Sequence, residues 1–231
     1  MRTAAIVLSA GKGTRMKTDV CKQYISVKGY PVLYYSLKAF EESNVDEVVV
    51  VAGAEDLGYV EDEIVFKYGM DKVIAIVAGG KERYDSVING LNVITECENV
   101  LVHDGARPLI EVRDINKIIE EISKGNACVA AMPVKDTIKI SDEEGYVKST
   151  PLRKLVWQIQ TPQAFKLETL KKAYRQMCLN RDKSITDDSM VVEKYSNEKI
   201  KLIETDYSNI KITTPEDILF MEQYLENKSS K

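Results

Sequence analysis

Short apolar runs alternate along this chain with longer stretches in which apolar residues recur every three or four positions. The runs cover residues 4–8, 48–52, 73–77, 100–103 and 128–132. Continuous apolar segments of this length are typical of strands buried in a parallel sheet. The stretches between them have helical spacing, as in Ile115, Ile118 and Ile122. The alternation predicts a Rossmann-like, doubly wound and mostly parallel α/β sheet, with ligands at the carboxyl edge of its strands.

The pattern changes after residue 133. Residues 137–140 and 146–149 alternate between apolar and polar side chains around the turn-rich segment Ser141–Gly145, which predicts a β-hairpin. A two-stranded ribbon is marginally stable alone, so it packs either on its own subunit or on a second copy of the protein, and both remain open here. Neither a repeat nor a linker divides the chain, so we expect one domain over residues 1–231 with residues 134–153 as its hairpin arm.

The last third of the chain returns to alternating elements. The polar segment Gln160–Gln163 contains a proline that restricts it to an extended or turn conformation. Apolar spacing then predicts a helix over residues 167–177, and Thr186–Asp188 has the composition of a helix N-cap. We expect a final strand at residues 200–203 and a final helix that begins near Pro215.

The first apolar run leads directly into a loop that contains Gly11 and Gly13, followed by Arg15 and Lys22. The glycines allow a tight turn that directs backbone N–H groups at an anion, and the two side chains add full positive charges. The third small residue of a dinucleotide fingerprint is replaced by Met16, and the P-loop spacing does not occur. The loop therefore predicts a phosphate site of another kind.

Composition and net charge indicate a globular protein with a small substrate. The chain has 231 residues, of which 44% are hydrophobic and 29% charged, as in an ordinary globular protein. A formal net charge of −4 argues against a nonspecific nucleic-acid binder, so the substrate is expected to be small. We predict a cytoplasmic protein without membrane association, because neither a signal-peptide pattern nor a run of about 18 apolar residues occurs. Four scattered cysteines indicate neither a zinc site nor a disulfide framework.

Taken together, seven motifs in order resemble the 2-C-methyl-D-erythritol 4-phosphate cytidylyltransferases of the non-mevalonate isoprenoid pathway, over nearly the whole chain. The motifs are Ala10–Met16 with Lys22–Tyr24, Gly79–Leu91, Val102–Pro108, Pro133–Lys139, Gln160–Phe165, Thr186–Asp188 and Asn209–Asp217. The resemblance implies that CTP and methylerythritol phosphate give the diphosphocytidyl product and pyrophosphate. It also implies Mg²⁺ as cofactor and a homodimer joined partly by the hairpin arm.

The resemblance further implies a role for individual residues. It assigns the reacting phosphates to Arg15, Lys22 and Lys211. It places CTP on the loop from Leu8 to Arg15 and on three residues outside this loop. The residues assigned to CTP are Leu8, Ser9, Ala10, Gly11, Gly13, Gly80, Ser86 and Asp104. The acceptor would contact Arg107, Thr137, Arg153, Thr161 and Thr186, with some of these residues supplied by the partner subunit.

The chemistry of such a reaction suits these residue types. The acceptor phosphate, with a second pKa of about 6, is largely dianionic at neutral pH, so no strong general base is needed. Catalysis requires cations and N–H dipoles that align like-charged groups and stabilise growing charge. Asp104 ends a strand and is the best carboxylate for Mg²⁺, with Asn209 as a weaker second ligand, although Asp104 also suits a turn. His103, the only histidine, is expected to pack or hydrogen-bond.

Three alternatives remain at this stage. A ribitol-5-phosphate cytidylyltransferase would share the fold and most of the motifs. A sugar-1-phosphate nucleotidyltransferase is a more distant possibility. A catalytically silent nucleotide-binding module would keep the fold without turnover, but Arg15, Lys22, Asp104 and Lys211 together argue against it.

Overall fold

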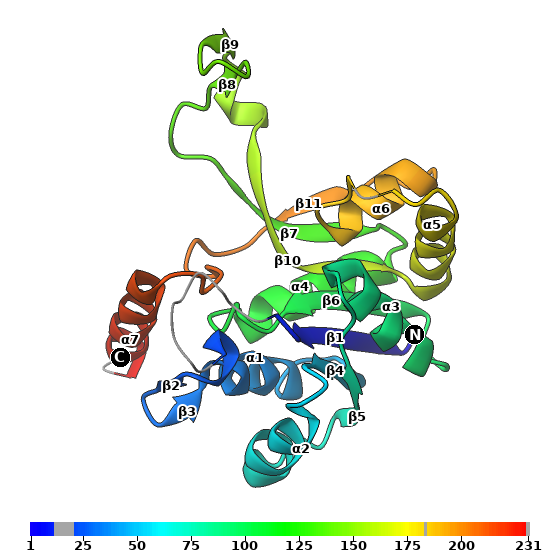
Figure 1. Cartoon of the computed structure of the whole chain (residues 1–231), viewed down its shortest axis with the longest axis vertical. Coiled ribbons are helices and arrows are strands. Elements are labelled where there is room, and N and C mark those ends of the chain that lie inside the picture. The colour runs from blue at the N-terminus through cyan, green and yellow to red at the C-terminus, as the bar shows by residue number, and fades with distance from the viewer. Residues whose placement is uncertain (12–20, 183, 230–231) are drawn as a thin grey trace.

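A seven-stranded sheet forms the centre of the protein (Figure 1). The computed structural model describes residues 1–11, 21–182 and 184–229. The strands, in their order across the sheet, are β11 (Lys201–Glu204), β7 (Cys128–Pro133), β10 (Trp157–Lys166), β6 (Asn99–Asp104), β1 (Thr3–Ser9), β4 (Glu47–Ala52) and β5 (Val73–Ala78). All neighbours are parallel except β10, which is antiparallel to both β6 and β7. The predicted doubly wound, mostly parallel sheet is confirmed.

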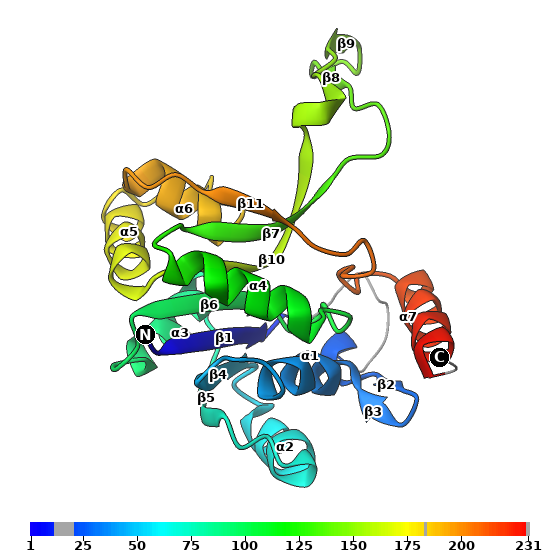
Figure 2. The same cartoon turned by 180° about the vertical axis from the view of Figure 1, so that it is seen from behind.

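Helices cover both faces of the sheet (Figures 1 and 2). The helices are α1 (Val32–Glu41), α2 (Leu57–Val60), α3 (Arg83–Val93), α4 (Val112–Ser123), α5 (Leu167–Leu179), α6 (Asp188–Tyr195) and α7 (Pro215–Ser229). One core contains Phe40 of α1 and Ile118 of α4, and the core on the opposite face contains Leu91 of α3 and Leu170 of α5. These four helices thus bury the apolar stripes that their spacing predicts.

Shorter elements complete the described chain. They are the 3₁₀ turns η2 (Lys22–Tyr24) and η4 (Arg153–Leu155), the π-helical segment η3 (Glu61–Phe66), and the two-stranded pairs β2 (Ser26–Val27) with β3 (Tyr30–Pro31) and β8 (Ile140–Ser141) with β9 (Val147–Ser149).

None of the helices in the described part of the chain combines the length and apolarity that a membrane span requires.

Two strands differ from the sequence-based expectation. The apolar run at residues 73–77 does form β5, but this strand lies at the sheet edge and leaves Ile74 53% exposed, so the expectation of a fully buried strand is wrong. Conversely, the polar segment Gln160–Gln163 lies inside the ten-residue strand β10. Its polar side chains are buried and hydrogen-bonded, as with Gln163 Nε2 on Asp187 Oδ2 at 2.8 Å, so apolar periodicity gave no sign of this strand.

The hairpin pair β8–β9 lies at the tip of an arm that projects away from the sheet (Figures 1 and 2). The paired strands are shorter than predicted, two and three residues long. Tyr146 and Val147 on this arm are 73% and 62% exposed. The alternative that the hairpin packs on its own subunit is therefore wrong.

The C-terminal segment returns to the carboxyl edge of the sheet. Ile212 is buried with Val27 of β2 and Met221 of α7 in a small third core. The Asp217 carboxylate caps the start of α7 by accepting hydrogen bonds from the backbone N–H groups of Thr213 and Thr214, at 2.7 and 2.8 Å. The predicted helix start is confirmed, and the residues just before it are held against the sheet.

Candidate active site

A cavity of about 230 Å³ lies at the carboxyl ends of β1 and β6, where the sheet order reverses. Such switch points are the usual ligand sites of open α/β sheets. The predicted nucleotide contacts that line it are Leu8, Ser9, Ala10, Gly11, Gly80, Ser86 and Asp104. Lys22 and Lys211 line the same cavity, whereas Gly13 and Arg15 lie outside the described residues. The structure thus brings together residues from five separate parts of the sequence.

Two glycine turns are packed against each other beside this cavity. A Cβ atom placed on Gly79 would lie 2.3 Å from Cβ of Ala10, so only glycine allows the two turns to approach so closely. Gln23, which is buried, donates hydrogen bonds from Nε2 to the carbonyl oxygens of Ser9 and Gly11, at 2.7 and 3.1 Å. Gln23 therefore fixes the start of the first turn, a function that the sequence analysis missed.

A second, larger cavity of about 560 Å³ adjoins the first. Three of the predicted acceptor contacts, Arg107, Thr161 and Thr186, line it. The charged side chains that line both cavities are Arg83, Asp104 and Lys211. A ligand in each cavity would meet the other at these three side chains.

Asp104 is the centre of the charge network between the cavities. Its Oδ2 lies 2.8 Å from Nζ of Lys211, and its Oδ1 lies 3.4 Å from Nε of Arg83. Burial alone would raise the pKa of Asp104, but Arg83 and Lys211 outweigh burial and hold that pKa well below its usual range. The carboxylate is therefore ionised at neutral pH and aligns the two cations.

Lys22 and Lys211 are brought together from opposite ends of the chain. Nζ of Lys22 donates a hydrogen bond to the carbonyl oxygen of Ile212 at 2.7 Å, and Ile212 directly follows Lys211. The burial of Ile212 holds this carbonyl in place. Both lysines consequently line the first cavity.

His103 is fully buried behind the second cavity. Its Nε2 lies 3.2 Å from the carbonyl oxygen of Arg107, which can only accept, so this nitrogen carries the proton. Nδ1 then accepts from the Thr161 hydroxyl at 3.1 Å, and Oγ1 of Thr161 accepts from the Asp104 N–H at 3.0 Å. Burial lowers the pKa of His103 to about 4. The histidine is thus a neutral hydrogen-bonding residue, in agreement with the prediction.

The remaining acceptor candidates, Thr137 and Arg153, lie on the projecting arm and do not line either cavity of their own chain. Both are exposed, and Nη1 of Arg153 donates a hydrogen bond to the carbonyl oxygen of Lys135 at 3.2 Å. The structure therefore separates them from Arg107, Thr161 and Thr186.

The comparisons with known proteins agree with this geometry. The family model of 2-C-methyl-D-erythritol 4-phosphate cytidylyltransferase matches residues 3–227. The chain belongs to this family. A relative of that name from Lachnoclostridium phytofermentans is 50% identical over 224 residues, covering 97% of this chain and 96% of the relative. Another, from Lachnospira eligens, is 51% identical over 219 residues, covering 93% and 95%.

Solved structures show the same fold. The crystal structure of 4-diphosphocytidyl-2C-methyl-D-erythritol synthase from Anaerococcus prevotii has a TM-score of 0.86 and 36% identity, and the match covers 97% of this chain and 96% of that one. The 2-C-methyl-D-erythritol 4-phosphate cytidylyltransferase of Thermus thermophilus has a TM-score of 0.79 and 25% identity, with coverage of 98% and 100%. This chain is thus an enzyme of the cytidylyltransferase family.

Arg83 and Asp188 form an ion pair at this cytidylyltransferase site to which the sequence analysis assigned no role. Nη2 of Arg83 lies 2.7 Å from Oδ2 of Asp188, although 105 residues separate them. Thr186–Asp188 does contain the predicted N-cap, since Asp187 accepts from the Met190 N–H at 3.0 Å. That role explains Asp187 but leaves the buried Asp188 carboxylate available to Arg83.

Proposed function

We propose that this chain transfers CMP from CTP to 2-C-methyl-D-erythritol 4-phosphate, giving 4-diphosphocytidyl-2-C-methyl-D-erythritol and pyrophosphate in the non-mevalonate isoprenoid pathway. The observation that carries this proposal is the pair of adjoining cavities that share Arg83, Asp104 and Lys211. The glycine segments of the first cavity suit a triphosphate, and the second cavity carries the predicted acceptor contacts Arg107, Thr161 and Thr186.

The transfer forms one bond and breaks one bond at the α-phosphorus of CTP. An oxygen of the acceptor phosphate attacks this phosphorus, and the bond to the bridging oxygen of the β-phosphate breaks as pyrophosphate leaves. The acceptor phosphate needs no base because its second pKa is about 6. Lys22, Lys211 and Arg15 are the cations that we assign to the reacting phosphates, where they offset repulsion and the charge on the leaving group.

We assign acceptor binding to residues from two subunits. Arg107 and Thr186 line the second cavity, and Thr161 holds the wall of that cavity through its bonds to His103 and Asp104. Thr137 and Arg153 would enter from the arm of a second copy, so the proposed unit is a homodimer joined by residues 134–153. The exposed apolar side chains of the arm support this assignment.

Mg²⁺ is the proposed cofactor, with Asp104 as its protein ligand. Among the described residues no group of three or more His, Cys, Asp or Glu side chains could hold a metal ion. Asp104 still fits as a single ligand, because it is ionised and each carboxylate oxygen can accept beyond its contact with Arg83 or Lys211. Asn209 fits less well, since its Nδ2 is bound to Gln160 and Thr161. Bound Mg²⁺ would neutralise triphosphate charge.

We also propose the domain organisation, the location and the absence of macromolecular partners that the sequence predicts. Residues 1–231 would act as one nucleotidyltransferase domain. CTP and sugar phosphates are charged metabolites of the cytoplasm, which is why we keep the predicted cytoplasmic location and expect neither membrane nor nucleic-acid partners.

A pyrophosphate-release assay tests the activity. The protein is incubated with CTP and Mg²⁺ and, in separate reactions, with methylerythritol phosphate, ribitol 5-phosphate or no acceptor. We expect turnover to depend on methylerythritol phosphate. Preference for ribitol 5-phosphate would show that the acceptor is wrong, and CTP binding without turnover on either acceptor would show a catalytically silent module.

A further inference from the structure

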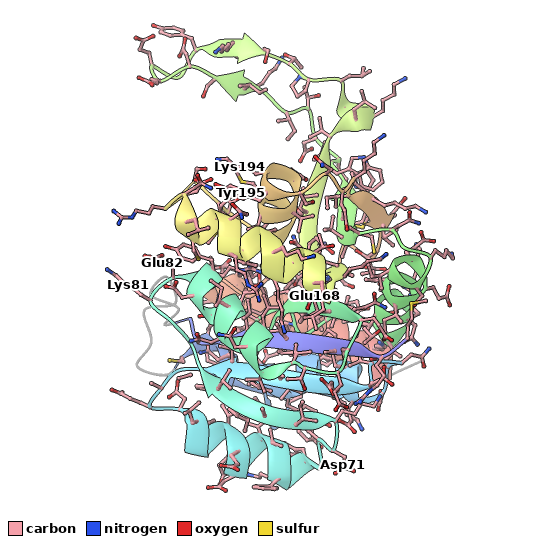
Figure 3. The ribbon with its side chains drawn as sticks, turned by 90° about the vertical axis from the view of Figure 1, so that its right-hand side faces the viewer. Asp71, Lys81, Glu82, Glu168, Lys194 and Tyr195 are labelled. Atoms are coloured by element: carbon pink, nitrogen blue, oxygen red, sulfur yellow. The ribbon has the colours of Figure 1, made fainter. Side chains whose placement is uncertain are left out.

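Arg83 occupies an electrostatically unfavourable position. It is the first residue of α3, whose start is set by a capping box between Glu82 and Asp85. A cation in the first turn of a helix is repelled by the positive end of the helix dipole. Figure 3 labels Lys81 and Glu82 in the loop before this helix, at the edge of the first cavity. We therefore expect either that a negatively charged partner offsets this repulsion or that the guanidinium is kept at this position for a function.

Two carboxylates compensate the guanidinium. Nη2 of Arg83 lies 2.7 Å from Oδ2 of Asp188, and Nε lies 3.4 Å from Oδ1 of Asp104. Burial alone would lower the pKa of Arg83, but Asp188 and Asp104 raise it above its ordinary value, so the side chain stays charged. With its side chain 31% exposed, Arg83 still reaches both cavities.

Asp188 is in turn fixed from behind. It is completely buried, and its Oδ1 accepts a hydrogen bond from the Tyr174 hydroxyl at 2.5 Å. Tyr174 is itself buried on α5 and lines neither of the two cavities. The Tyr174–Asp188 pair thus holds Arg83 from the side opposite to the site, so the guanidinium has little freedom to turn away.

One end of the guanidinium remains available for a ligand. Within the described part of the chain, Nη1 of Arg83 has no hydrogen-bond partner, whereas Nη2 and Nε are both paired. The two substrates of the proposed reaction each carry phosphate, and Arg presents donors in a fixed fork that suits phosphate oxygens. We propose that Arg83 is a further phosphate ligand of this site, shared by the nucleotide and the acceptor and positioned by Asp188 and Tyr174.

This inference rests on the proposed function, and binding measurements separate the two. The dissociation constants of CTP with Mg²⁺ and of methylerythritol phosphate are measured separately by calorimetry for Arg83→Gln. Because Arg83 lines both cavities, we expect both ligands to bind about 10-fold more weakly or worse, the loss of one charge-assisted hydrogen bond. The control is Arg113→Gln, an arginine in the first turn of α4 that pairs with Glu111 outside both cavities. Unchanged affinity for either ligand would overturn the shared role.

Arg83→Gln alone leaves the buried Asp188 charge without its cation and is expected to lower the melting temperature. The double variant Arg83→Gln/Asp188→Asn removes both charges and should restore folding stability toward that of the wild type. If Arg83 only supports the fold, binding and turnover return together with stability. We expect stability to return while kcat/KM stays reduced by about 10-fold or more.

The positioning role of Tyr174 has its own matched control. Tyr174→Phe removes the hydrogen bond to Asp188, and Tyr195→Phe removes a comparable bond from Tyr195 to Asp182 at the other end of α6, where Figure 3 labels Tyr195. We expect Tyr174→Phe to lower kcat by about 3- to 10-fold, because Asp188 loses the charge-assisted hydrogen bond that fixes it, and Tyr195→Phe to leave kcat unchanged. Equal kcat values for the two variants would contradict positioning.

The outcomes also distinguish this inference from the proposed function. Wild-type protein that binds CTP but does not use methylerythritol phosphate would refute the function and leave the phosphate contact of Arg83 measurable with CTP. If the wild type turns over and the Arg83→Gln variant binds both ligands with unchanged affinity, the proposed phosphate contact of Arg83 is refuted and the proposed function stands.

Discussion

Nζ of Lys211 lies 2.8 Å from Oδ2 of Asp104, although 107 residues separate the two in the sequence. This pair lies on the boundary between two cavities, and it joins the end of a central strand to the segment before the last helix. Because Asp104 is also paired with Arg83, the site holds cations in fixed positions before any phosphate arrives. Such preorganisation is what a reaction between two anionic substrates requires.

Loss of either lysine should impair the chemical step. For Lys22→Ala or Lys211→Ala we expect kcat/KM to fall roughly 30-fold or more. This corresponds to a loss of about 2 kcal/mol of transition-state stabilisation. Steady-state kinetics of pyrophosphate release measures this change. Lys117→Ala is the control, since Nζ of Lys117 also donates to a backbone carbonyl, that of Glu204, but lies outside both cavities. Near-normal kcat/KM in both site variants would contradict the assigned roles.

The arm residue Arg153 should act in the site of the other subunit. Arg153→Ala is expected to raise the KM for the acceptor with little change in CTP binding, because Arg153 is assigned to the acceptor cavity of the partner subunit and does not line the first cavity of its own chain. Arg107→Ala should have the same effect from within the subunit.

Mixing the two variants distinguishes the subunits. Random reassembly makes about half of the dimers mixed, and each mixed dimer has one site with both arginines intact. About a quarter of wild-type activity should therefore return on mixing. No recovery would show that Arg153 acts within its own chain.

The apolar tip of the arm should be required for dimerisation. Val147→Lys places a charge on a side chain that is 62% exposed in the single chain, so we expect folded monomers in sedimentation velocity. Phe66→Lys is the control, because Phe66 is 70% exposed on η3, remote from the arm. A wild-type protein that sediments as a monomer would refute the proposed dimer directly.

His103 should titrate far below the usual range of histidine. Its pKa of about 4 in the folded protein lies below the value of about 6.5 expected after unfolding. Between these values the unfolded chain binds more protons, so this group favours the folded state above pH 6.5. Its contribution declines as the pH falls toward 4, by up to about 1.4 kcal/mol per pH unit. Because the sequence has one histidine, NMR of its ring follows the titration without overlap, and an inflection near pH 6.5 in the folded state would contradict the buried network.

Much of this architecture follows from local patterns. The apolar runs predicted the parallel strands, and the position of Asp104 after one of them predicted its place at the carboxyl edge of the sheet. Strand β10 was missed because its inward side chains include Gln160 and Thr161, which are buried through hydrogen bonds and leave no apolar period.

The charge network could not be predicted in the same way. Arg83 is 21 residues from Asp104 and 105 from Asp188, and periodicity carries no information on such long-range pairs. The arm shows the opposite case. The alternation around Ser141–Gly145 predicted the hairpin, but it did not predict that the hairpin projects away from the sheet.

We propose above all that CTP and the acceptor bind in the two adjoining cavities and react where these meet, beside Asp104 and Lys211. Phosphorus NMR of a reaction with CTP, Mg²⁺ and methylerythritol phosphate tests it most directly. We predict that the acceptor monophosphate signal disappears while a diphosphate diester and pyrophosphate appear in equal amounts. An unchanged acceptor signal, or formation of CMP with pyrophosphate by hydrolysis alone, would contradict the account.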